Sequence, residues 1–107
     1  KTLQYARGYA AAVFLLSADE ILWEKVRKNV LDTGIYFDRV RLGGVTLEQY
    51  ILFHAAKDVY SGTKHIRLSE LTDRELIPDE ILCLIVNAFV IEKCGVEIVK
   101  QEVWNAD

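Results

Sequence analysis

The chain has 107 residues, of which 51% are hydrophobic and 27% charged, and its formal net charge is −3 at pH 7. A length near the modal domain size predicts a single domain, residues 1–107, with one hydrophobic core. The acidic balance argues against duplex nucleic acid or an anionic membrane surface as a partner, and the ordinary composition excludes a disordered chain.

Residues 2–16 carry apolar side chains at helical spacing and predict the first helix. Its opposite face is only half polar, because Gly8, Ala11 and Leu15 lie there. Small residues let a second helix approach closely, and contiguous apolar exposure marks interfaces. We therefore expect this face to join two copies of the chain in a homodimer. Trp104, near the end of the sequence, is a further interface candidate.

The sequence predicts a second helix over residues 18–33. Ser17 and Glu20 form the S-x-x-E pattern of a capping box at its start, and Gly34 follows as a stop. Residues 35–42 are rich in β-branched and aromatic side chains, so we expect a short strand there.

A second capping box, formed by Thr46 and Gln49, predicts a third helix. This helix should run to about Ser61 and end at Gly62, which suits a left-handed C-cap. Residues 64–68 are a candidate second strand.

Residues 78–94 are apolar almost all round the predicted helix axis, and Asn87 is the one strongly polar residue between Ile81 and Ile91. A short helical turn over residues 69–76 leads into this helix. Its apolar stretch spans about 16 Å, roughly half the hydrocarbon thickness of a bilayer. The pattern therefore predicts a central buried helix and no membrane span.

Cys83 and Cys94 would lie about 16 Å apart on this helix, whereas a disulfide requires Cα atoms within roughly 7 Å. We expect two free, buried and unreactive thiols, which fits a reducing cytoplasm. The segment 96–104 fits a helix as well as a strand, and its β-branched content favours a strand.

Tyr50, His54 and Asp58 recur at one-turn spacing on the third helix and form a candidate polar cluster. A carboxylate can orient an imidazole as a base, and a tyrosine can donate a hydrogen bond, so a small enzyme is one hypothesis. The sequence contains no recognisable nucleophile motif, phosphate loop or metal-ligand set beside them. We therefore favour a structural role and predict no catalytic, cofactor or metal residue.

The order of elements is similar to that of a winged-helix module: helix 47–61, strand 64–68, short helix 69–76, helix 78–94 and strand 96–103. A DNA-reading version needs a polar or basic outward face on its second principal helix. Here that helix reads LIVNAFVI. The resemblance therefore implies a degenerate, transcription-related or protein-binding module.

These patterns predict a mainly α fold with a minor β component. We expect about four main helices, with the buried helix 78–94 at the centre, and a small sheet of two or three short strands. The favoured function is a small cytoplasmic interaction or regulatory protein that is not an enzyme and that forms a homodimer or binds another protein. The alternatives are the winged-helix-like module and a small enzyme using His54 and Asp58.

Overall fold

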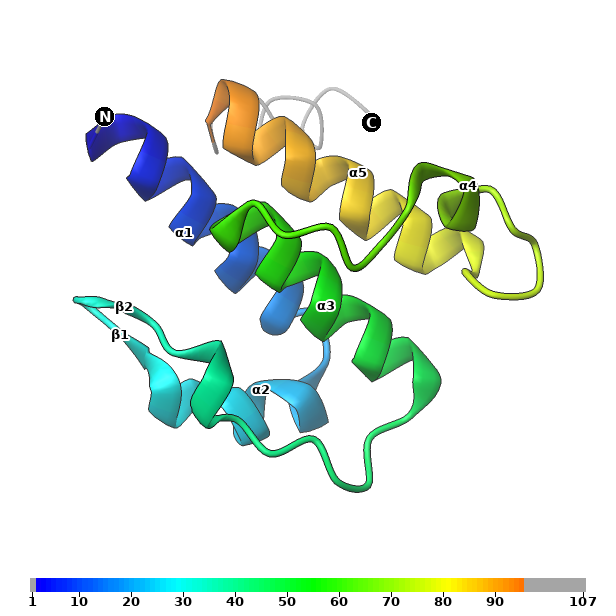
Figure 1. The fold of residues 1–107 in the computed structure, drawn as a ribbon, viewed down its shortest axis with the longest axis horizontal. Coiled ribbons are helices and arrows are strands. Elements are labelled where there is room, and N and C mark those ends of the chain that lie inside the picture. The colour runs from blue at the N-terminus through cyan, green and yellow to red at the C-terminus, as the bar shows by residue number, and fades with distance from the viewer. Residues whose placement is uncertain (1, 96–107) are drawn as a thin grey trace, which may run out of the picture.

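Three long helices lie side by side and form the body of the fold: α1 (Thr2–Leu16), α3 (Leu47–Ser61) and α5 (Asp79–Cys94) (Figure 1). α1 packs against both of the others and runs in the opposite direction (Figure 1). The computed structural model describes residues 2–95, with the side chains of residues 6–95. This part of the chain is mainly helical with one small antiparallel sheet, which confirms the predicted fold class.

The middle of the body is occupied by α1, where we expected α5. Ala11 and Leu15 are fully buried, and a Cβ added at Gly8 would lie 3.7 Å from the carbonyl oxygen of Val59 on α3. The expected outward face on α1 is therefore wrong, because its small residues allow close packing within the same chain. Trp104, the other predicted interface residue, lies outside the described residues.

The second helix begins later and ends earlier than predicted. α2 (Glu20–Val26) is capped by Asp19, whose Oδ1 accepts a hydrogen bond from the backbone N–H of Leu22 at 2.9 Å. The hydroxyl of Ser17 donates instead to the carbonyl of Phe14 in the last turn of α1, at 3.4 Å. Ser17 therefore lies at the end of α1, and the predicted capping box does not form.

A hairpin replaces the second half of the predicted helix. After the 3₁₀ turn η1 (Arg27–Asn29), β1 (Val30–Leu31) pairs antiparallel with β2 (Gly34–Ile35). Two residues join the strands, which is the commonest hairpin loop length. The helical pattern fails here because Val30 favours a pleated strand over a helix.

The predicted strand over residues 35–42 ends almost where it begins, because the chain turns into η2 (Phe37–Arg39). The ring centroid of Phe37 lies 5.4 Å from that of Phe53 and 5.7 Å from that of Tyr60, both on α3. Burial of this side chain against α3 therefore holds the segment to the body and takes it out of the strand.

The third helix has the predicted capping box. The hydroxyl oxygen of Thr46 accepts from the backbone N–H of Gln49, and the side-chain oxygen of Gln49 accepts from the backbone N–H of Thr46. Gly62 ends α3 with a φ of 74°, a left-handed conformation that suits glycine. Gln49 also donates to the capping Asp19 at 3.1 Å, so α2 and α3 begin at one shared polar contact.

The predicted strand over residues 64–68 is wrong, because residues 64–67 form an irregular loop and Leu68 begins a helix. The backbone N–H groups of His65 and Ile66 donate to the carboxylate of Asp58 on α3, at 2.9 and 2.7 Å. These donors are therefore not available to a strand partner, and the loop is attached to α3 instead.

α4 (Leu68–Leu71) is shorter than the predicted helical turn. The Oε1 atom of Glu70 accepts from the backbone N–H of Arg67 at 2.7 Å and so closes its first turn. Asp73 then starts a separate turn, because its Oδ1 accepts from the backbone N–H of Leu76 at 3.1 Å.

α5 runs between the predicted ends, and Gly95 follows it with a φ of 96°. Its inner face is buried and consists of Ile81, Ile85, Ala88 and Ile91. Val86 and Phe89 on the opposite face are exposed, so the prediction of a helix buried all round is wrong. Cys83 and Cys94 are free but also exposed, which corrects the prediction of buried thiols. None of the described helices is long and apolar enough to cross a membrane.

The likeness to a winged-helix module is not found in the described part of the chain. That order of elements needs a strand at residues 64–68, and none forms there. The two-stranded sheet lies earlier, between α2 and α3. The predicted strand over 96–104 falls outside the described residues.

Candidate functional site

α5 lies at one edge of the three-helix body (Figure 1). The face of α5 opposite its buried residues carries a row of apolar side chains that are exposed or only partly buried. We call this row the outer stripe, and it consists of Leu82, Cys83, Val86, Phe89 and Val90. Val86 is 48% exposed and Phe89 is 47% exposed, although both lie in the middle of the helix. A half-exposed aromatic ring beside a half-exposed valine leaves a contiguous apolar surface in water.

α4 extends this apolar surface beyond the outer stripe. Leu68, at the start of α4, is 83% exposed, the largest value among the exposed large hydrophobic side chains of the described residues. Leu68, Leu71 and Phe89 line a hollow of about 120 Å³, with Ile85 among the other lining residues. The outer stripe and α4 therefore form one surface that can receive an apolar side chain from another molecule.

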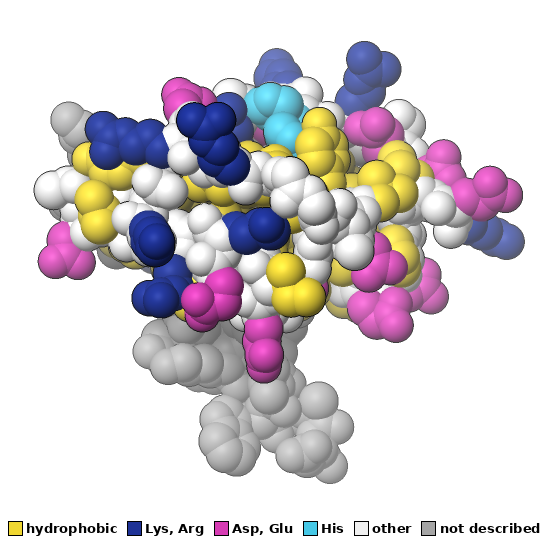
Figure 2. Space-filling view, turned by 90° about the horizontal axis from the view of Figure 1, so that it is seen from below, with side chains coloured by type: hydrophobic (Ala, Val, Ile, Leu, Met, Phe, Trp, Pro, Cys, Tyr) yellow, Lys and Arg dark blue, Asp and Glu magenta, His cyan; other side chains and the backbone are white. Residues whose placement is uncertain are grey.

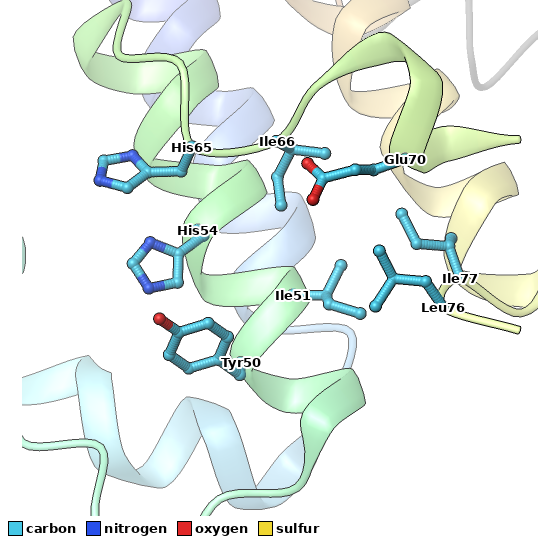
Figure 3. A pocket seen from close by; sticks show the side chains of 8 residues that line it. All are labelled: Tyr50, Ile51, His54, His65, Ile66, Glu70, Leu76 and Ile77. Atoms are coloured by element: carbon cyan, nitrogen blue, oxygen red, sulfur yellow. The ribbon is translucent and has the colours of Figure 1, made fainter. Parts of the chain in front are cut away.

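The candidate polar cluster lies on α3 and not on the outer stripe of α5, and Tyr50 and His54 extend from the same side of α3 (Figure 3). The ring centroids of Tyr50 and His54 are 4.3 Å apart, and those of His54 and His65 are 4.7 Å apart. The structure therefore brings two of the three predicted residues into contact. It adds His65 from the loop after α3, a neighbour that helical spacing along α3 could not predict.

Asp58, the third predicted residue, acts on the loop and not on His54. Its Oδ1 accepts from the hydroxyl of Thr63 at 2.6 Å and interacts with Nδ1 of His65 at 2.9 Å. The same carboxylate accepts the two backbone N–H groups of the loop described above. Burial raises the pKa of Asp58, but these hydrogen bonds outweigh burial and hold that pKa below its usual value.

The surroundings of His54 favour the neutral form of its imidazole. Burial lowers the pKa of His54, and the neighbouring His65 and Lys57 lower it further. Its Nδ1 atom is buried and has no hydrogen-bond partner among the described residues. A positive charge on this ring would therefore lose part of its solvation and would be repelled by Lys57.

A pocket of about 170 Å³ opens beside this cluster, between α3, the following loop and the segment before α5 (Figure 3). Its lining is Tyr50, Ile51, His54, His65, Ile66, Glu70, Leu76 and Ile77. The Asp58–His65 pair could orient a base, but the lining residues include no serine, threonine or cysteine nucleophile. Within the described residues, no three His, Cys, Asp or Glu side chains are placed to hold a metal ion.

Figure 2 shows the molecule from below the view of Figure 1, and the face seen there carries many charges. Lys and Arg side chains gather mainly on its left half, and Asp and Glu side chains mainly on its right half. This separation of charges distinguishes that face from the outer stripe, where uncharged side chains follow one another along a helix.

Comparisons with models of protein families, with curated proteins and with solved structures give no match for this chain.

Proposed function

We propose that this chain is a protein-interaction domain without enzymatic activity, and that its binding surface is the outer stripe of α5 together with Leu68 of α4. The observation that carries the proposal is the exposure of Val86 and Phe89 at the centre of a helix whose other face is buried. Burial of one such side chain from full exposure contributes about 1.5–3 kcal/mol, so a partner that covers the exposed half of each gains about 1 kcal/mol per side chain. Aromatic side chains at the centre of an interface are common hot spots.

The enzymatic alternative has less support from the geometry. Asp58 is engaged by the loop after α3, so it does not orient His54 as a base. The winged-helix alternative has less support because residues 64–67 form a loop and Leu68 begins α4, so no strand forms there.

A cytoplasmic location is part of the proposal. Cys83 and Cys94 are both free and exposed. Exposed thiols persist in reducing compartments, where disulfides are rare.

Photo-crosslinking in the cells that produce the protein tests the proposed function. A benzophenone amino acid replaces Phe89 in one variant and Leu47 in a control, because Leu47 is an exposed apolar residue of α3. We expect illumination to give discrete, heavier covalent products from position 89 and none from position 47. The absence of any product at position 89 would contradict the proposed function, whatever the partner is.

A further inference from the structure

The outer stripe reads almost the same in both directions along α5. Val86 is its centre, Cys83 and Phe89 lie three residues to either side, Leu82 and Val90 four, and Asp79 and Lys93 seven. With 3.6 residues per turn, all seven positions fall within an arc of about 120° on the helix. They are exposed or only partly buried, whereas the opposite face is buried in the body.

We propose that the partner is a second copy of this chain, and that two α5 helices pack antiparallel with a two-fold axis at Val86. This inference rests on the proposed function and names the partner of the same surface. In such a pair Val86 meets its own copy, while Cys83 of one chain faces Phe89 of the other. The small thiol then lies opposite the large ring, so the same surface is complementary to itself, as a two-fold contact requires.

The charges at the two ends of α5 favour the antiparallel direction. Asp79 and Glu80 lie in the first turn and Lys93 in the last, and all three are exposed. An antiparallel pair places Asp79 of one chain near Lys93 of the other. A parallel pair would place like charges together at both ends and would align the helix dipoles unfavourably.

The mass of the purified full chain in solution is the first test. Light scattering across a concentration series should show a change from the chain mass of 12.2 kDa to about twice that value. Val86→Glu places a charge on the axis, so it should raise the dissociation constant at least about 100-fold. Ile21→Glu is the matched control, because Ile21 is a 61% exposed apolar residue of α2, and it should leave the constant unchanged.

Cross-linking tests the register without relying on the folding of a charged variant. In a background with Cys83→Ser and Cys94→Ser, the variant Val86→Cys should be joined to itself by a short bismaleimide. A chain with Cys83 alone should be joined efficiently to a chain with Phe89→Cys alone, and each should react poorly with its own kind.

Each outcome of these tests is decisive. A wild-type chain that stays monomeric at the highest concentration overturns the homodimer. If position 89 is still photo-crosslinked to a different protein, the proposed function survives that result. A dimer in which Cys83 is joined to Cys83, or in which Val86→Cys gives no product, overturns the antiparallel arrangement. A dimer with the Cys83–Phe89 pairing supports it.

Discussion

α1 and α5 are both almost wholly apolar helices, yet they have opposite roles in the fold. α1 lies between α3 and α5, and Ala11 and Leu15 at its centre are fully buried. Among the described residues, α5 packs against α1 and α3 on one side, and Val86 and Phe89 on its other side are half exposed. Apolar composition therefore tells how much surface a helix must cover, and position in the bundle decides whether the same chain covers it.

The largest expected effect is the difference in stability loss between shortening a core side chain of α1 and shortening an outer-stripe side chain of α5. Leu15→Ala removes a fully buried side chain and should lower the free energy of unfolding by about 2–5 kcal/mol. Val86→Ala should lower it by less than about 1 kcal/mol at concentrations where the chain is monomeric, because Val86 is half exposed. Urea denaturation of both variants measures this difference. Equal losses would mean that α5 is as central as α1.

The next prediction concerns the loop after α3 and α4, which flank the outer stripe. We expect them to open without loosening the core around α1. Asp58→Asn removes the charged acceptor of four hydrogen bonds from Thr63, His65 and Ile66. The expected loss is about 1–3 kcal/mol, confined to opening of the loop. Hydrogen exchange should become faster in residues 62–71 and stay unchanged in α1. Faster exchange throughout α1 would contradict local attachment.

The pH dependence of folding stability should arise from α3, because neither the centre of α1 nor the outer stripe contains a histidine. The pKa of His54 is lower in the folded chain, so the unfolded chain takes up the proton first. Folding stability should therefore fall as the pH drops below about 6.5 and level off below the folded-state pKa. Urea midpoints at pH 7.5 and 5.5 should differ more for the wild type than for His54→Gln. An identical difference would exclude His54 as the cause.

The smallest effect concerns how tightly α1 is enclosed. A methyl group at Gly8 would lie 3.7 Å from the Val59 carbonyl oxygen, an ordinary contact distance. Gly8→Ala should therefore fit and should stabilise the chain by about 0.5–1 kcal/mol through higher helix propensity. Thermal unfolding of this variant measures the gain. A lower melting temperature would show that α3 has no room for the methyl group.

Local sequence signals predicted where α3 and α5 begin and end better than they predicted which elements pack against each other. Thr46 with Gln49 gave the start of α3, and Gly62 gave its end, because capping depends on residues close in the chain. The cap of α2 was misassigned because Asp19 and Ser17 are both good N-cap residues. Which of the two residues caps α2 depends on where α1 ends, and Ser17 is hydrogen-bonded to the last turn of α1.

Contacts between distant residues account for the errors at the candidate sites. Asp58 binds the loop that contains His65, so its partner could not be read from one-turn spacing on α3. The two faces of α5 are equally apolar, so the pattern alone could not tell which one is buried. The symmetric spacing around Val86 was present in the sequence, and it became informative once the exposed face was known.

Peptide-resolved thiol labelling of the wild-type chain shows whether a second copy covers the outer stripe, because Cys83 belongs to the outer stripe and Cys94 does not. Both thiols are exposed in the single chain, so a maleimide should label both rapidly at concentrations where the protein is monomeric. If two α5 helices pair through the outer stripe, Cys83 becomes protected in step with the doubling of mass, while Cys94 stays reactive. A Cys83 that is protected at every concentration, or one that stays reactive in the dimer, would contradict it.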